Sequence, residues 1–160
     1  MLDLWKAFET VAPEALMYEA VQVNFPKRLM AMLILTYREP RVLKAHQSLS
    51  AITTAEQGNL AGGSHATTCL TFLLFRAIRR VSSLTHQVKQ RAPVDDCTLQ
   101  KAVTEDVRIS DLFKVAAIFC KDLKRLRLVL HPSKSGYVAT TSKLGRAFEP
   151  FAQKLGIVKR

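Results

Sequence analysis

Cysteine is scarce in this sequence. Its 160 residues include only three cysteines, Cys69, Cys97 and Cys120. An odd number at wide spacing predicts neither a disulfide framework nor a CxxC metal site. We therefore expect three reduced thiols, mostly in the core, in an intracellular protein of the nucleus or cytoplasm.

Long apolar runs and a secretion signal are also missing. The longest apolar run, 29–35, is far shorter than the roughly 18 residues of a membrane-spanning helix. Asp3 and Glu9 interrupt the amino-terminal segment, and no cationic start precedes an apolar block. The sequence thus predicts a protein that is not secreted and has no membrane partner.

Acidic residues are few relative to basic ones. The chain has 13 Asp and Glu against 24 Lys and Arg, a formal charge of +11. Such an excess favours a polyanionic partner, because cations that neutralise phosphates release counterions. The alternative is a soluble protein that is merely basic. Hydrophobic residues make up 48% of the chain, which is typical of a folded domain with a core.

Helical and extended patterns alternate along the chain. Apolar spacing, Pro13 in a first helical turn and the glycines of the loops define the boundaries. Together they predict an α+β fold. The predicted helices are 13–23, 27–37, 64–84, 104–125 and 142–155. The predicted strands are 1–5, 41–45, 49–54, 88–93, 97–103, 126–130 and 137–141.

Two acidic centres lie at predicted strand ends. Asp3 follows a short apolar stretch, and Asp95 and Asp96 stand between the arms of a predicted hairpin. Carboxylates are the ligands that Mg²⁺ prefers, and two ions can hold the attacking and leaving oxygens of an in-line displacement. The alternative is that Asp95-Asp96 is an ordinary polar turn.

Four segments, in order, resemble the motifs of retroelement-type reverse transcriptases, which are RNA-directed DNA polymerases. The family writes motifs A to D as LDLSKAFDTV, GLPQG, [YF]xDD and LNxxKT. The matching segments here are LDLWKAFETV at 2–11, GNLAG at 58–62, VDD at 94–96 and LHPSKS at 130–135.

The resemblance implies a palm-like domain, with a ferredoxin-like or RRM-like, mostly antiparallel sheet backed by helices. Residues 1–160 would form this single domain, without fingers before it or a thumb after it. Asp3 and Asp95 would be the two main ligands of Mg²⁺, or of Mn²⁺ in its place, with Asp96 beside them and the Leu4 carbonyl completing the coordination. Lys134 would stabilise charge on the triphosphate or donate a proton to pyrophosphate, although a solvated surface lysine is the alternative.

The resemblance also implies roles in substrate binding. Phe8 would stack under the incoming sugar and select dNTPs, although a core aromatic is the alternative. Gly62 would let the backbone approach the nascent base pair. Ala61, which stands where the family has glutamine, would lie beside the nucleotide.

Basic residues on the predicted helix 64–84 complete the site prediction. Arg76, Arg79 and Arg80 share one face and would contact the phosphates of a template–primer made of RNA and DNA. A solvated charged face is the other interpretation. For the whole chain, the alternative function is a basic nucleic-acid-binding module, derived from a retroelement, that performs no chemistry.

Overall fold

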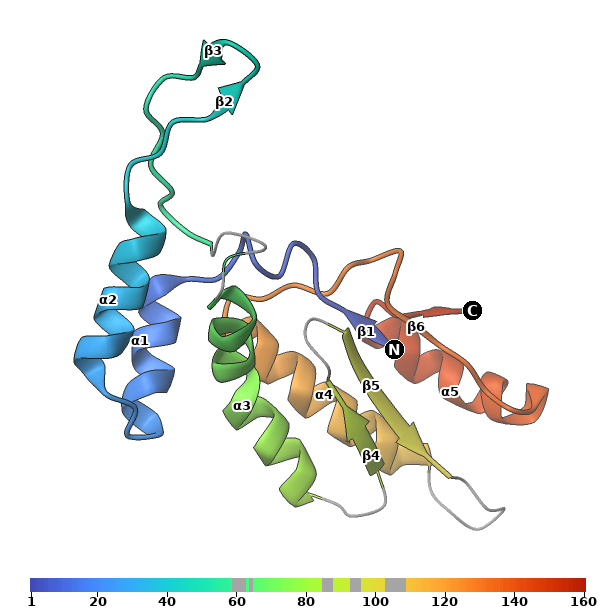
Figure 1. Cartoon of the computed structure of the whole chain (residues 1–160). Helices are drawn as coiled ribbons and strands as arrows, with labels where there is room; N and C mark the ends of the chain where they lie inside the picture. Colours follow the sequence, from blue (N-terminus) through green and yellow to red (C-terminus); the bar gives the residue numbers. More distant parts are fainter. Residues whose placement is uncertain (59–62, 64, 85–87, 93–95, 103–108) are drawn as a thin grey trace. The chain divides into compact units, whose positions relative to one another are not determined.

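The computed structural model of the chain describes residues 1–58, 63, 65–84, 88–92, 96–102 and 109–160. These residues form an α+β structure of five helices and small, mostly antiparallel sheets (Figure 1). The predicted α+β class is confirmed. Contacts divide the chain into two compact units, one of residues 1–7 and 74–160 and the other of residues 8–73. The single palm-like domain remains a prediction.

The unit of residues 8–73 contains a helix pair and a hairpin. Helices α1 (Pro13–Gln22) and α2 (Lys27–Arg38) pack against each other and begin where the sequence predicts. The hairpin strands β2 (Lys44–Ala45) and β3 (Ser48–Leu49) are shorter than predicted. All four strand residues are exposed, so little packing extends the ladder.

A three-stranded antiparallel sheet forms the centre of the other unit. Its strands are β1 (Leu2–Asp3), β4 (Val88–Arg91) and β5 (Asp96–Lys101), in the order β1-β5-β4. Strands β4 and β5 are the described parts of the hairpin that the sequence predicts. Figure 1 shows the three strands side by side, with β5 in the middle.

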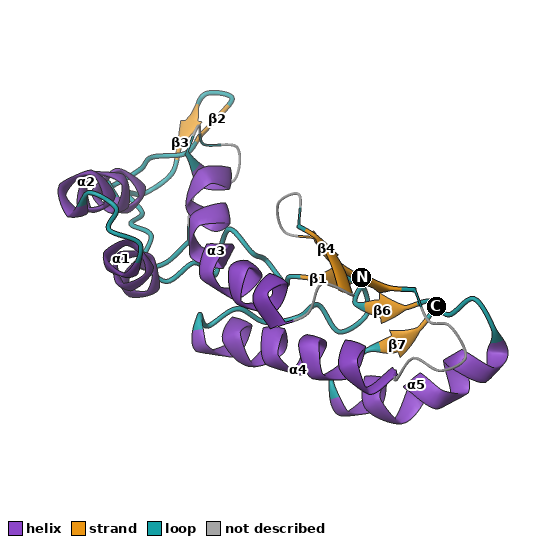
Figure 2. Ribbon diagram, turned by 90° about the horizontal axis from the view of Figure 1, so that it is seen from below, coloured by secondary structure: helices purple, strands orange, loops and turns teal. Residues whose placement is uncertain are grey.

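Two helices cover one face of these strands. Helices α4 (Ile109–Arg125) and α5 (Ser142–Lys154) lie together below the strands in Figure 2. The parallel strands β6 (Gly136–Tyr137) and β7 (Val158–Lys159) flank α5. Helix α3 (Ala66–Leu84) belongs to both units. The core of the unit that contains the sheet includes Leu2, Leu4, Cys97, Val115, Phe119, Leu123 and Leu128, each at most 4% exposed.

The three cysteines are buried and unbridged, as the sequence predicts. Burial raises the pKa of the Cys69 and Cys120 thiols. Both are therefore mainly protonated at neutral pH and behave as small apolar side chains.

Helices α1, α4 and α5 end in the same way. A left-handed residue follows each helix: Asn24 at φ 56°, Arg127 at φ 61° and Gly156 at φ 67°. The residue after it donates its N–H to the carbonyl five positions earlier, at 2.9 Å in all three cases. This is the Schellman arrangement, which satisfies carbonyls at a helix end.

The helix end at Arg127 overturns one prediction. Residues 126–130 were expected to form a strand, but residues 126–128 close α4 instead. Only Leu130 remains extended enough to bridge to Leu4. The apolar pattern of residues 126–130 reflects burial of Leu126 and Leu128 under the helix end and not a strand.

Candidate active site

The register of β1 and β5 places two acids opposite each other. Asp3 pairs with Asp96, and Leu2 pairs with Cys97, in an antiparallel ladder. Residues directly opposite on paired strands direct their side chains to the same face of the sheet. The two carboxylates, 93 positions apart in sequence, therefore share one face of the sheet.

The backbone of Asp3 shows that this is a closely spaced pair. Its N–H donates to Ser135 Oγ at 3.1 Å, and its carbonyl accepts from the His131 N–H at 2.8 Å. Both groups thus point away from β5. A pair of this kind, with no backbone bonds between its members, has Cα atoms about 4.5 Å apart and close side chains. Like charges at this separation repel each other, which favours a cation beside them.

Leu4 offers a further oxygen on the same side. Trp5 N–H donates to the Val129 carbonyl at 2.8 Å, while Leu4 itself forms only a bridge with Leu130. Since backbone groups alternate along a strand, the Leu4 carbonyl points to the edge of β1 that faces β5. Carboxylate and carbonyl oxygens are ligands that Mg²⁺ and Mn²⁺ accept, so the chemistry of these three residues is compatible with such an ion, and metal binding remains a prediction.

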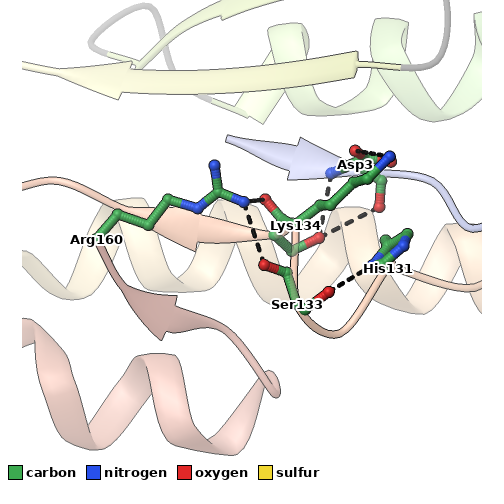
Figure 3. Close-up of polar contacts among 6 residues, drawn as sticks. Asp3, His131, Ser133, Lys134 and Arg160 are labelled. Carbon is green, nitrogen blue, oxygen red and sulfur yellow. Dashed lines mark hydrogen bonds and ion pairs between the residues drawn. The ribbon is translucent and has the colours of Figure 1, made fainter.

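Lys134 is the cation that the structure places at this pair. Its Nζ lies 4.0 Å from Asp3 Oδ2, and Figure 3 shows the side chain running to the carboxylate. The Lys134 side chain is 62% exposed, whereas that of Asp3 is 16% exposed. Lys134 therefore partly neutralises Asp3 while most of its surface remains open to a ligand.

The turn that carries Lys134 is held from two sides. Ser135 is fully buried, and its hydroxyl donates to the Asp3 carbonyl at 3.2 Å. Arg160 Nη2 donates to the carbonyls of Ser133, at 3.2 Å, and Lys134 (Figure 3). Ser133 Oγ lies 3.3 Å from His131 Nδ1. Sequence reasoning missed Ser135 and Arg160 as site residues, because their roles depend on contacts across 132 and 26 positions.

The open face of the sheet is polar. The β4–β5 register places Lys89 beside Gln100 and Arg91 beside Thr98, on the face that also carries the acidic pair. Lys89 and Arg91 are exposed on the edge strand. This face therefore carries exposed cations along β4 and the two acids at the β1 end.

Several predicted site residues are not placed at this pair. Asp95, Ala61 and Gly62 lie outside the described residues. Phe8 belongs to the unit of residues 8–73 and is partly buried there. Among the described residues alone, no three His, Cys, Asp or Glu side chains gather as a metal-binding group. The roles assigned to Asp95, Phe8, Ala61 and Gly62 remain predictions.

The three arginines of α3 differ in their surroundings. Arg80 Nη1 is 2.9 Å from Oδ1 of Asp122, a carboxylate only 9% exposed. Arg79 is exposed, and Arg76 is partly buried. Arg80 thus has a structural contact that sequence reasoning did not find, and nucleic-acid binding by the three arginines remains a prediction.

Comparison with known proteins adds no relative. No protein-family model, curated protein or solved structure matches the chain. Within the described part of the chain, no helix combines the length and apolar character needed to cross a bilayer. Function is therefore inferred from the residues of the site.

Proposed function

We propose that the chain carries a reverse-transcriptase-like palm, an RNA-directed DNA polymerase domain that transfers a deoxynucleotide to a nucleic-acid primer. The observation that carries the proposal is the direct pairing of Asp3 with Asp96 on neighbouring strands. These acids belong to the segments that resemble motifs A and C. A sheet of order β1-β5-β4, with helices on one face and a polar open face, supports the palm-like fold.

Asp3 and Asp96 would hold the divalent metal ions, with the Leu4 carbonyl and, from the sequence, Asp95. When bound, Mg²⁺ supplies a lowered pKa at the primer 3′-hydroxyl and charge neutralisation at the departing pyrophosphate. The protein's own contribution is to fix the two carboxylates on paired strands, so that little rearrangement precedes binding.

Lys134 contributes a positive charge beside these acids. Its ammonium group, held near Asp3 by the turn that Ser135 and Arg160 fix, would face the triphosphate and hold a proton for the leaving pyrophosphate. The open face with Lys89 and Arg91 would bind backbone phosphates of the template–primer.

Primer extension on an RNA template tests the proposal. The wild-type chain should extend a labelled DNA primer with dNTPs in Mg²⁺ or Mn²⁺. Asp3→Asn, Asp95→Asn and Asp96→Asn should each lower extension by at least roughly 100-fold, because each removes a carboxylate ligand. Glu149→Gln removes an exposed charge on α5 and is the matched control, with activity unchanged.

Binding measurements separate the two functions that the sequence raised. Mn²⁺ binding, followed by water-proton relaxation, should weaken in Asp3→Asn and Asp96→Asn but not in Glu149→Gln. If the wild type extends no primer, yet binds template–primer equally well or better as Asp95→Asn, the chain is a nucleic-acid-binding module and the polymerase proposal fails.

A further inference from the structure

An exposed aromatic pair lies on the open face of the sheet, beside the acidic pair. Trp5 is the only tryptophan of the chain, and it is 41% exposed although its ring is a large apolar surface. Its ring centroid lies 4.6 Å from that of His131, and the two ring planes are tilted by 58°. The contact with His131 therefore orients the Trp5 ring but leaves much of it in contact with solvent.

The strand pattern explains why both rings face this way. Leu4 is 3% exposed in the core, so its neighbours Asp3 and Trp5 face the opposite side. Leu4 also forms an antiparallel bridge with Leu130. The His131 N–H donates to the Asp3 carbonyl at 2.8 Å, as this register requires. His131 thus lies opposite Asp3, and its ring shares a face with Trp5.

The residue after Trp5 has a strained backbone. Lys6 has a φ of 45°, in the left-handed region that residues other than glycine rarely adopt. Strained residues of this kind are concentrated at binding and catalytic sites. The Lys6 Nζ lies over the Trp5 ring, 5.8 Å from its centroid, which is close to the outer limit of about 6 Å for a cation–π contact. The turn thus brings a flexible cation to an exposed ring.

A nucleobase with its phosphate matches an aromatic ring that has cations around it. Bases of every sequence stack on exposed aromatic side chains, while nearby lysines and arginines bind the backbone. Lys6 supplies a cation at the ring, and Lys134 supplies another in the turn that follows His131. A base inside a duplex is already stacked on both sides, so the ring selects an unpaired base. A base on the ring displaces the Lys6 ammonium group, whose long stem lets it reach the phosphate.

We propose that Trp5 and His131 form a stacking platform for one unpaired base of single-stranded RNA or DNA, with Lys6 at the phosphate of that nucleotide. The platform begins two residues, roughly 7 Å, along the chain from Asp3. Under the proposed function, on which this assignment rests, the strand is the single-stranded part of the template beside the metal-binding acids. Stacking itself requires neither a metal ion nor a dNTP.

Fluorescence of the single tryptophan tests the proposal. The full chain is titrated in EDTA with a single-stranded DNA of about 12 nucleotides, and with an abasic strand of the same length and charge. The first strand should quench Trp5 fluorescence saturably, because a base stacks on the ring. The abasic strand should bind through its phosphates without this quenching, and a fully paired duplex should quench little.

Substitutions separate stacking from a structural role of the ring. In anisotropy measurements with a labelled strand, Trp5→Ala should weaken binding roughly tenfold, whereas Trp5→Phe should retain most of the affinity. His131→Ala should weaken binding by a smaller factor, because its ring is smaller. Tyr18→Ala removes another exposed aromatic, from α1, and is the matched control, with affinity changed by less than about twofold.

The salt dependence of binding gives a further readout that a structural role would not move. Trp5→Ala should leave the slope of log affinity against log salt concentration unchanged, because no phosphate contact is lost. Lys6→Gln should reduce the magnitude of this slope by about 0.7, the value for one phosphate contact to a single strand. An unchanged slope in Lys6→Gln would remove Lys6 from the site.

Three results would overturn the stacking platform. The first is that the single strand fails to quench Trp5, or that the abasic strand quenches it equally. The second is an equal loss of affinity in Trp5→Ala and Tyr18→Ala, with both variants folded by circular dichroism. The third is a blue shift of Trp5 fluorescence with anionic lipid vesicles and no quenching by either strand, which would identify a membrane surface as the partner.

Failure of the platform and failure of the polymerase proposal are distinguishable. Primer extension that depends on Asp3, without quenching of Trp5 by single strands, would overturn the platform alone. Quenching of Trp5 without any primer extension would overturn the polymerase proposal and leave the platform as part of a nucleic-acid-binding module.

Discussion

Replacing Ser135 with alanine tests how the candidate site is held together. The Ser135 hydroxyl is fully buried, accepts from the Asp3 N–H at 3.1 Å and donates to the Asp3 carbonyl at 3.2 Å. Each hydrogen bond contributes about 0.5–1.5 kcal/mol net, and Ser135→Ala also leaves the Asp3 N–H without its partner. We expect the free energy of unfolding to fall by about 2 kcal/mol.

Two measurements check this value. For a chain of this size, about 2 kcal/mol corresponds to a melting temperature roughly 4–8 °C lower by circular dichroism. Native-state hydrogen exchange of the Asp3 amide should accelerate by about 30-fold, because its acceptor is gone. The exchange measurement reports on the site itself, whichever of the two units unfolds first.

Ser133→Ala is the matched control, since Ser133 lies in the same turn. Its hydroxyl is exposed and lies 3.3 Å from His131 Nδ1. The control should change stability by no more than about 0.5 kcal/mol. If Ser133→Ala and Ser135→Ala have the same effect, or if exchange of the Asp3 amide is unchanged, then Ser135 does not fix β1 and the proposed anchoring is wrong.

Three other substitutions have effects that follow from single contacts. Arg80→Met should lower the free energy of unfolding in urea by about 1–3 kcal/mol, because it leaves the buried Asp122 carboxylate unpaired. The control Arg79→Met should change this free energy by less than about 0.5 kcal/mol. Equal effects of the two substitutions would contradict the ion pair. Arg127→Gly should raise stability by up to about 1 kcal/mol, because glycine adopts a φ of 61° without strain; a loss would mean that the side chain itself stabilises the helix end. Gly58→Ala should lower the melting temperature by several degrees, because it lowers the free energy of unfolding by at least about 2 kcal/mol. Gly58 has a φ of 89°, and a Cβ at this position would lie 2.6 Å from the backbone oxygen of Glu9. An unchanged melting temperature would refute this clash.

Local signals predicted most of the helices and both hairpins. Pro13 fixed the start of α1, and apolar spacing predicted α2 to within a residue or so. Helix α5 forms despite Gly145 and Pro150, because Thr141 caps it and Phe148 is buried beneath it. These elements depend on residues within a few positions of one another, which a sequence shows directly.

Elements that depend on distant partners were missed. Strand β7 (Val158–Lys159) is two residues long and forms through its pairing with β6. Residues 126–130 have the composition of a strand, but Arg127 adopts a left-handed conformation and the hydrogen bonds around it end α4. The same reasoning explains Ser135 and Arg160, whose contacts arise only when the chain ends are brought together.

The proposed function gives the pairing of Asp3 with Asp96 a role in ligand binding. Two carboxylates directly opposite on paired strands repel each other. Lys134, 4.0 Å from Asp3, offsets little of this repulsion, because exposed ion pairs contribute about 0–1 kcal/mol. The buried Ser135 hydroxyl nevertheless bonds both the N–H and the carbonyl of Asp3, and these hydrogen bonds hold Asp3 in its position opposite Asp96. Under the proposed function, a divalent cation bound by both carboxylates would turn this repulsion into attraction.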